Sequence, residues 1–185
     1  STSYEQYMRA LCKRIGFPFE NVYSTHLNLD KYEITPQEKR KLTQIKEEMV
    51  KLPVPDIPRG AVSLEDFPQP LQKTVERLDE VFWKDISSMK IGRVLHDVDP
   101  VGGREKAVAV EDIARKLKTN LQNVMYVGDS ITDLEAFRLV RNAGGLTISF
   151  NGNNFAVREA EAAVFSDSAV VTAVLAIVLT RFGKA

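Results

Sequence analysis

The most informative hydrophobic pattern in this chain is a short apolar run over residues 124–127, which ends at a glycine and passes into polar residues. Runs of this length that are rich in β-branched and aromatic residues are typical of strands covered on both faces of a parallel sheet. Residues 132–143 follow with apolar side chains at helical spacing, and they stop before Gly144 and Gly145, a common C-terminal signal. The pattern therefore predicts a strand, a sharp turn and a helix.

Two more helices are predicted upstream of this strand. Gly102 and Gly103 open an amphipathic segment that ends near Asn120 and leads directly into the strand. At the start of the chain, residues 4–15 carry apolar side chains at helical spacing and are closed by Gly16.

The most apolar stretch of the chain is residues 169–179. It is shorter than the ~20 residues needed to span a bilayer. We expect a final core or interface helix here, started by Asp167 or Ser168 and ended by Arg181 and Lys184.

The other organisational feature is a long segment in the middle of the chain. It lies between a first short β run, expected at residues 21–24, and the return of the core near residue 91. The sequence predicts a core domain built from residues 1–30 and 91–185, and a small, mainly helical insertion over residues 31–90.

Two helices are predicted in the insertion, joined by a proline-rich linker at residues 53–58. The first is well defined at its start, because Thr35 is a suitable N-cap, Pro36 stands at the first helical position and Glu38 completes a capping box. The second is expected over residues 70–84.

Acidic side chains follow the predicted strand directly. Asp129 would lie at the carboxyl end of the strand and Asp133 in the first turn of the next helix. Ligands collect at that edge of open α/β sheets, where carboxylates can hold a hard cation against a phosphate. Lys106 stands at the start of a helix, an unfavourable end for a cation unless an anion or a carboxylate faces it. Ordinary helix capping and a solvated lysine are the alternative interpretation.

These motifs resemble the haloacid dehalogenase superfamily of phosphohydrolases and phosphotransferases. The helix with Lys106 is similar to the third motif of that family, and residues 128–133, Gly-Asp-Ser-Ile-Thr-Asp, match its Gly-Asp-x-x-x-Asp fourth motif. The resemblance covers roughly residues 102–173. It implies an α/β fold with a Rossmann-like core, a parallel sheet with helices on both faces, and a cap-like helical insertion that chooses the substrate.

The resemblance also implies roles for particular residues. Lys106 would neutralise charge on the nucleophile and the transferring phosphoryl group, while Asp129 would bind Mg²⁺ directly and Asp133 directly or through water. Ser1 is the first choice for the phosphate-binding hydroxyl of the second motif, and Thr2 is the second choice. The expected activity is Mg²⁺-dependent hydrolysis of a small phosphorylated substrate through an aspartyl-phosphate.

One departure from the family pattern is important. The catalytic Asp-x-Asp motif of the family lies before the second motif, and no residue precedes Ser1 here. Its strand would be central in the sheet, and each buried backbone group left unpaired costs ~1–3 kcal/mol. We therefore expect an upstream segment, a second chain or a swapped segment to complete the sheet, or a reorganised fold, and little catalysis by this chain alone. A catalytically inactive binding or assembly module is the alternative.

A rearranged site is a further alternative. Residues 94–99 end in the pair Asp97 and Asp99, and a strand here would make a right-handed unit with the strand after the Lys106 helix. Against it, Arg93 and His96 interrupt a run that should be apolar in a central parallel strand.

Composition narrows the class of protein. The chain has 185 residues, of which 44% are hydrophobic, enough for one medium domain and a small insert. Lys plus Arg and Asp plus Glu number 25 each, so we expect neither nucleic acid nor a membrane as a partner. The single cysteine, Cys12, excludes an internal disulfide framework. Since no signal peptide is visible, a cytoplasmic protein is expected.

Overall fold

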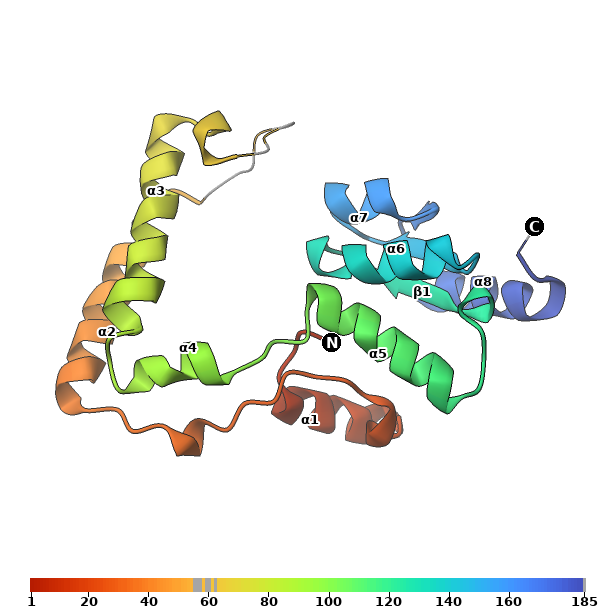
Figure 1. The fold of residues 1–185 in the computed structure, drawn as a ribbon, viewed down its shortest axis with the longest axis horizontal. Helices are drawn as coiled ribbons and strands as arrows, with labels where there is room; N and C mark the ends of the chain where they lie inside the picture. Colours follow the sequence, from red (N-terminus) through yellow and green to blue (C-terminus); the bar gives the residue numbers. More distant parts are fainter. Residues whose placement is uncertain (55–57, 59–60, 62, 185) are drawn as a thin grey trace. The chain divides into compact units, whose positions relative to one another are not determined.

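A computed structural model describes residues 1–54, 58, 61 and 63–184 (Figure 1). The predicted proline-rich linker at residues 53–58 lies partly outside the described residues. The chain divides into two compact units, one formed by Ser1–His26 with Pro100–Ala185 and the other by Leu27–Asp99. We call them the core unit and the helical unit.

The core unit contains a parallel sheet of three strands in the order β1-β2-β3. The strands are β1 (Met125–Gly128), β2 (Leu146–Phe150) and β3 (Ala162–Val164). Val127 of β1 pairs with Ile148 of β2, and Ser149 of β2 pairs with Ala163 of β3. Neither ladder shifts its register along its length. The prediction of an α/β fold with a parallel sheet is confirmed.

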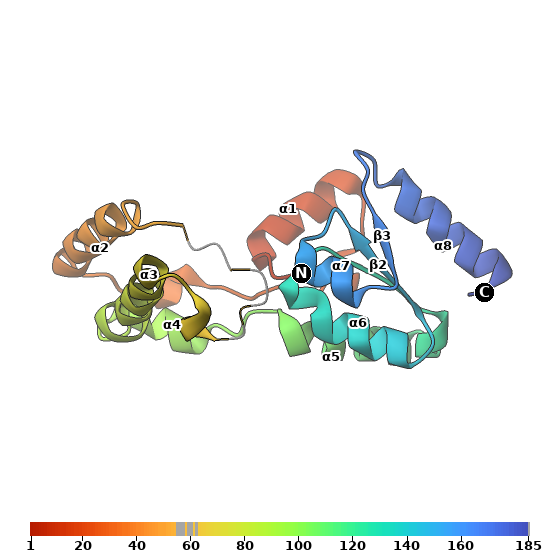
Figure 2. The same ribbon diagram turned by 90° about the horizontal axis from the view of Figure 1, so that it is seen from above.

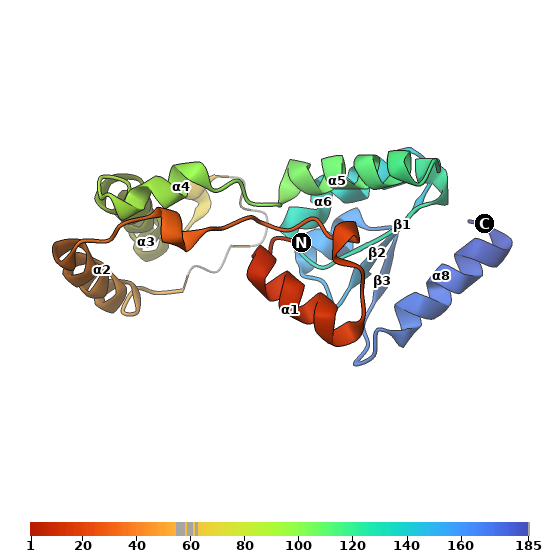
Figure 3. The same cartoon turned by 90° about the horizontal axis from the view of Figure 1, so that it is seen from below.

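Helices lie on both sides of this sheet. Helices α5 and α6 lie on one side, and α1 and α8 on the other (Figures 2 and 3). The helices of the core unit are α1 (Glu5–Ile15), α5 (Gly103–Lys116), α6 (Leu134–Asn142), α7 (Asn154–Glu159) and α8 (Val170–Phe182). Among the described residues, no helix is long and apolar enough to cross a membrane.

Glycines end two of these elements as the sequence predicts, for different physical reasons. Gly16 follows α1 with a left-handed φ of 71°, and Gly144 follows α6 with a φ of 86°. Gly145 is needed for space, because a Cβ there would lie 2.4 Å from the carbonyl oxygen of Leu121. These constraints fix the turn from α6 into β2.

The side chains between the sheet and helices α5 and α6 form a hydrophobic core on that side of the sheet. Val110, Ala136 and Val140 are buried together, with Tyr126 packed against them. The ring of Tyr126 meets the ring of Phe137 edge-on at 5.4 Å, and Phe137 is completely buried. This packing holds β1 and the start of α6 in a fixed relation.

The predicted β run at residues 21–24 is wrong. Residues Phe19–Asn21 form a 3₁₀ turn, and the chain makes only an isolated parallel bridge between Thr25 and Tyr4 in this region. Tyr4 is the N-cap of α1, so its chain turns into a helix immediately after the bridge. A ladder cannot continue beyond one pair.

The helical unit contains α2 (Pro36–Met49), α3 (Gln69–Glu80) and α4 (Val94–Asp97). The predicted capping box of α2 is confirmed: the Thr35 side chain accepts a hydrogen bond from the Glu38 N–H, and the Glu38 carboxylate accepts one from the Thr35 N–H. The second predicted helix is present, but Val81–Ile86 continues α3 as a π-helix.

The strand required by the rearranged-site alternative is absent. Ile91–Arg93 is a 3₁₀ turn that leads into α4, so Asp97 lies on a helix and not at the end of a strand. Arg93 forms an ion pair with Asp97 one helical turn away, at 3.6 Å. Local i, i+4 pairing of this kind supports a helix, and the alternative using Asp97 and Asp99 is therefore wrong.

Candidate active site

The candidate site lies where β1 ends at Gly128 and the chain turns into α6. A Cβ at Gly128 would lie 2.5 Å from Cγ of Asp133, so this position has no room for a side chain. Ile131–Asp133 forms a 3₁₀ turn before α6 begins. The missing side chain at residue 128 allows the Asp133 carboxylate to fold back under the end of the strand.

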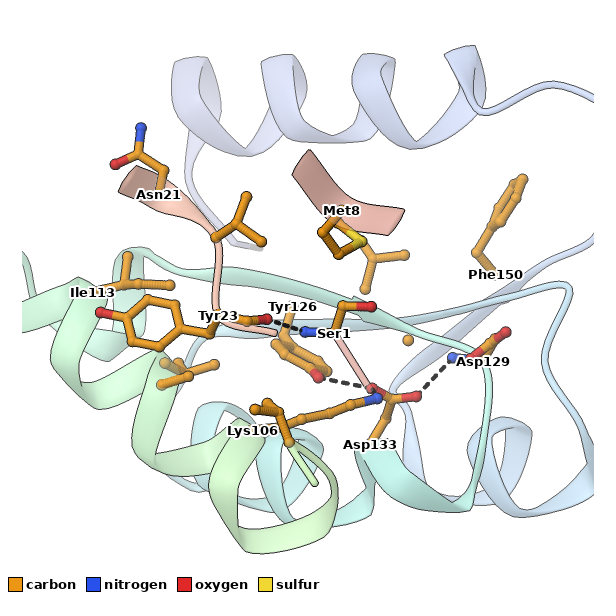
Figure 4. A pocket seen from close by; sticks show the side chains of 16 residues that line it. Ser1, Met8, Asn21, Tyr23, Lys106, Ile113, Tyr126, Asp129, Asp133 and Phe150 are labelled. Carbon is orange, nitrogen blue, oxygen red and sulfur yellow. Dashed lines mark hydrogen bonds and ion pairs between the residues drawn. The ribbon is translucent and has the colours of Figure 1, made fainter. Parts of the chain in front are cut away.

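Asp133 is the centre of a hydrogen-bond network and is only 3% exposed. Its Oδ1 accepts hydrogen bonds from Lys106 Nζ and from the Tyr126 hydroxyl, each at 2.8 Å. Its Oδ2 accepts from the backbone N–H groups of Asp129 and Ser130 at 3.1 Å, and from the Ser130 hydroxyl at 3.2 Å. The carboxylate thus joins α5, β1 and the turn that follows β1 (Figure 4).

The network sets the protonation of its members. Burial alone would raise the pKa of the Asp133 carboxyl, but hydrogen bonds from Lys106 and Tyr126 outweigh it and hold the pKa below the usual value. Burial raises the pKa of the Tyr126 hydroxyl, and the hydrogen bond to Asp133 raises it further. Asp133 is therefore an anion and Tyr126 a neutral donor near neutral pH.

Lys106 reaches this network from the first turn of α5. Its side chain is 14% exposed, and Nζ also donates to the Thr132 hydroxyl at 2.8 Å. An ammonium group carries three hydrogens, and within the described residues two of them have partners. A carboxylate does face this lysine, as its position at a helix start indicates.

Asp129 differs from Asp133 in solvent exposure and in the contacts of its side chain. Its side chain is exposed and makes no hydrogen bond or ion pair with another described residue. Its backbone is fixed at both ends, because its N–H donates to Asp133 and its carbonyl accepts from the N–H of Asn153 at 2.8 Å. The result is an uncommitted carboxylate on a rigid backbone (Figure 4).

A cavity of about 520 Å³ in the core unit opens beside these residues. One end is polar and is lined by Ser1, Lys106, Asp129 and Asp133. The rest is largely apolar and runs between β1, the inner face of α5 and the segment at residues 21–23.

The structure brings four of the five predicted site residues around one cavity. Ser1, Lys106, Asp129 and Asp133 all line it, and the Ser1 hydroxyl accepts a hydrogen bond from the Ser3 N–H at 3.2 Å. Thr2 does not line the cavity; its carbonyl accepts a hydrogen bond from the Thr25 hydroxyl. Whether these residues act on a substrate remains a prediction.

Three further members of the site are not evident from spacing alone: Tyr126, Ser130 and Thr132. Ser130 carried a usable signal, because Ser130-x-x-Asp133 is a capping-box pattern and the structure forms that box. Tyr126 carried a weaker one, since residues two apart on a strand share a face and Tyr126 precedes Gly128 by two.

No group of three or more His, Cys, Asp or Glu side chains arranged to hold a metal ion is found in the described part of the chain. The reason is visible in the network. The oxygens of Asp133 already accept five hydrogen bonds, so the carboxylate free for a cation is that of Asp129.

Comparison with known proteins identifies the family and the fold of this chain. A solved structure, that of gene product AF1437 from Archaeoglobus fulgidus, is similar with a TM-score of 0.74 and 25% sequence identity. The match covers 98% of this chain and 51% of AF1437, so the chain spans about half the length of that protein. Comparison with curated proteins finds no match. The sequence profile of the haloacid dehalogenase-like hydrolases matches residues 5–174, and the chain therefore belongs to that family.

Proposed function

We propose that this chain forms the metal- and phosphate-binding part of a Mg²⁺-dependent phosphohydrolase that acts on a small phosphorylated substrate. The observation that carries the proposal is the Asp133 network, which fixes the Lys106 ammonium and the backbone of Asp129 at one end of one cavity, where the Asp129 carboxylate is exposed. Fixed opposite charges around a cavity suit phosphoryl transfer, in which positioning and charge stabilisation provide most of the catalysis.

The donor set fits Mg²⁺ held mainly by one side chain. Mg²⁺ in proteins usually retains several waters and is bound through one or two carboxylates together with substrate phosphate. Asp129 would supply the direct carboxylate, and Asp133 would act indirectly, because its oxygens are occupied by protein donors. When bound, the ion would draw charge from the phosphoryl oxygens and so favour attack at phosphorus.

Two other side chains would contact the phosphoryl group. Among the described residues Lys106 has partners for two of its three hydrogens, so the third would bind a phosphoryl oxygen, and the ammonium would neutralise charge that develops during transfer. The Ser1 hydroxyl accepts from the Ser3 N–H, which leaves its own hydrogen for a phosphoryl oxygen. These are the roles expected from the family, and they stay proposals here.

The attacking carboxylate would come from a strand added to β1. Among the described residues β1 pairs with β2 alone, and the apolar part of the cavity runs along its free edge. An upstream segment or a second chain that adds a strand there would place its carboxyl end beside Lys106. Its carboxylate would attack phosphorus and break the phosphorus–oxygen bond to the substrate's alcohol, which would leave with a proton from solvent. Water would then attack the aspartyl-phosphate, releasing inorganic phosphate and regenerating the carboxylate.

Hydrolysis of p-nitrophenyl phosphate tests this proposal. We expect slow turnover or none by the chain alone, and Mg²⁺-dependent turnover when the polypeptide encoded upstream of Ser1 is included. In that longer protein, Asp129→Asn should lower kcat by ~100-fold or more. Glu111→Gln is the matched control, because Glu111 is an exposed acid on α5 outside the cavity. Turnover that survives Asp129→Asn would contradict the metal assignment, and absence of Mg²⁺ binding by calorimetry would favour a binding or assembly module.

A further inference from the structure

The last helix, α8, is apolar on every side. Its thirteen residues include one charged side chain, Arg181, and none of them is buried. Its hydroxyls are used internally, because Thr172 donates to the carbonyl of Ala169 and Thr180 to that of Ala176. A helix that is apolar all round is normally covered on all sides. We therefore asked what covers the side of α8 that faces away from the sheet.

The inner side of α8 is accounted for by the core unit. Leu175, Ala176 and Leu179 are half-buried, and α8 contacts β1. The end of the helix is tied down by Lys184, which donates to the carbonyl of Gly145 at 2.8 Å and pairs with Glu161 at 2.5 Å. The helix is thus fixed on the sheet with its outer side presented to solvent (Figure 2).

The outer side forms a regular stripe. Val170, Val174 and Ile177 follow one another at spacings of four and three residues, and their exposed fractions are 64%, 51% and 53%. Residues at this spacing lie on one face of a helix. Val178 flanks the stripe, and Arg181 continues it at the next turn.

We propose that this stripe pairs with the same stripe of a second copy of the chain, antiparallel, about a two-fold axis through Val174. Two uncommitted charges select this register. Asp167 lies just before α8 and Arg181 in its last turn; both are exposed, and neither side chain has a hydrogen-bond or ion-pair partner in the described structure. Each is seven residues from Val174 in the sequence, although Asp167 precedes the helix. Antiparallel pairing centred at Val174 therefore brings the end of one copy that carries Asp167 to the end of the other that carries Arg181, on both sides of the axis.

The same observations favour a second copy over other occupants. A helix that lies on a membrane surface needs a polar, usually basic, face opposite its apolar face, and α8 has none. An acid and a base placed at equal sequence distances on either side of Val174 become complementary to each other across a two-fold axis, whereas an unrelated partner would need no such symmetry. With 25 acidic and 25 basic side chains, two copies also carry no net repulsion.

The interface would be small. Thirteen helical residues span roughly 20 Å, so one helix pair lies at the low end of specific interfaces. We therefore expect a dimer that dissociates on dilution, with a Kd in the micromolar range of ~1–100 μM.

Sedimentation equilibrium of the purified chain tests the proposal. Val174→Glu should abolish the dimer, because two carboxylates would face each other across the axis. Val108→Glu is the matched control, since Val108 lies on α5 with an exposed fraction of 52%, close to that of Val174, and should leave the dimer intact. Far-UV circular dichroism of Val174→Glu verifies that α8 still folds.

A charge swap makes the test independent of folding defects. Asp167→Arg and Arg181→Asp should each weaken dimerisation ~5-fold or more, and the double variant should restore it. A chain that is monomeric up to ~1 mM, or a dimer insensitive to Val174→Glu, would overturn the proposal. So would a monomer that binds phosphatidylglycerol vesicles and loses this binding in Val174→Glu. None of these outcomes bears on phosphatase activity.

Discussion

The Asp133 cluster of the core unit and the Arg77 cluster of the helical unit each join one charged residue to several polar partners. In the first, the side chains of Asp133 and Lys106 are 4% and 14% exposed. In the second, Arg77 pairs with Glu48 at 2.5 Å and Asp85 at 3.2 Å, and these three side chains are 29% to 42% exposed. The two clusters have similar sets of polar partners, but they differ in solvent exposure.

Burial changes what each cluster does. In the Asp133 cluster, water cannot replace a lost partner, so every hydrogen bond fixes the position of a functional group. In the Arg77 cluster, water and salt screen the charges, so the contacts contribute less and tolerate change. We therefore expect rigidity at the end of β1 and adaptability around Arg77, and the predictions below test that contrast.

The largest effect is expected for Asp133→Ala. The substitution leaves the Lys106 ammonium and the N–H groups of Asp129 and Ser130 without their acceptor, and breaking a buried charge pair costs ~3–5 kcal/mol. Urea denaturation measures this loss. Asp129→Ala, four residues away, should change the free energy of unfolding by less than ~0.5 kcal/mol, because its carboxylate has no hydrogen-bond or ion-pair partner in the described part of the chain. Equal losses in the two variants would remove the contrast between the two acids.

The pH dependence of stability should depend on the same carboxylate. Because the folded pKa of Asp133 is lowered, its contribution is complete above the unfolded pKa of ~3.9 and is lost as pH falls through the folded pKa. Asp133→Asn should therefore flatten the acid side of the stability curve below about pH 4. Unfolding curves from pH 7 downward would show this, and an unchanged acid slope in Asp133→Asn would show that other carboxylates carry it.

A smaller and salt-sensitive effect is expected for Arg77→Ala. The charges around Arg77 are partly solvated, and the Debye length falls from ~10 Å at 0.1 M salt to ~3 Å at 1 M. The loss in stability should therefore shrink as salt is added, whereas the loss for Asp133→Ala should not. Thermal unfolding of both variants at the two salt concentrations compares them. A loss of stability in Arg77→Ala that does not depend on salt would show that the Arg77 cluster is as poorly screened by solvent as the Asp133 cluster.

The two clusters also show what sequence patterns reveal. Lys106, Asp129 and Asp133 were found because their spacing relative to a glycine turn and a helix start is fixed by local chain geometry. Pairing between Arg77 and Glu48 was not predictable, because it depends on how two helices pack and no local spacing encodes it. For the same reason the sequence did not reveal that Thr132 would share Lys106 with Asp133.

The wrong prediction at residues 21–24 has the same origin. The β run at residues 21–24 has suitable residues, but a strand also needs a neighbour, and Tyr4 turns into α1 after one pair. The apolar character of α8 was evident from composition, yet the exposure of its outer side required the positions of the sheet and of Lys184. Local chain geometry can be inferred from one sequence, whereas the residues that pack against each surface cannot.

The smallest effect is expected at a buried hydroxyl that lacks a partner. Thr147 and Ser149 are both completely buried on β2, and both point to the same face because they are two residues apart. The Thr147 hydroxyl accepts from the Glu161 N–H at 3.0 Å, while the Ser149 hydroxyl has no hydrogen-bond partner among the described residues.

Removing the two hydroxyls should therefore have different consequences. Thr147→Val removes the acceptor of the part-buried Glu161 N–H and should cost ~0.5–1.5 kcal/mol, whereas Ser149→Ala removes an unpaired polar group and should be neutral or stabilising by up to ~1 kcal/mol. Urea denaturation of both variants measures the difference. If Ser149→Ala instead destabilises the protein as much as Thr147→Val, the Ser149 hydroxyl has a hydrogen-bond partner. The loss of stability at both positions would then come from lost hydrogen bonds and not from burial alone.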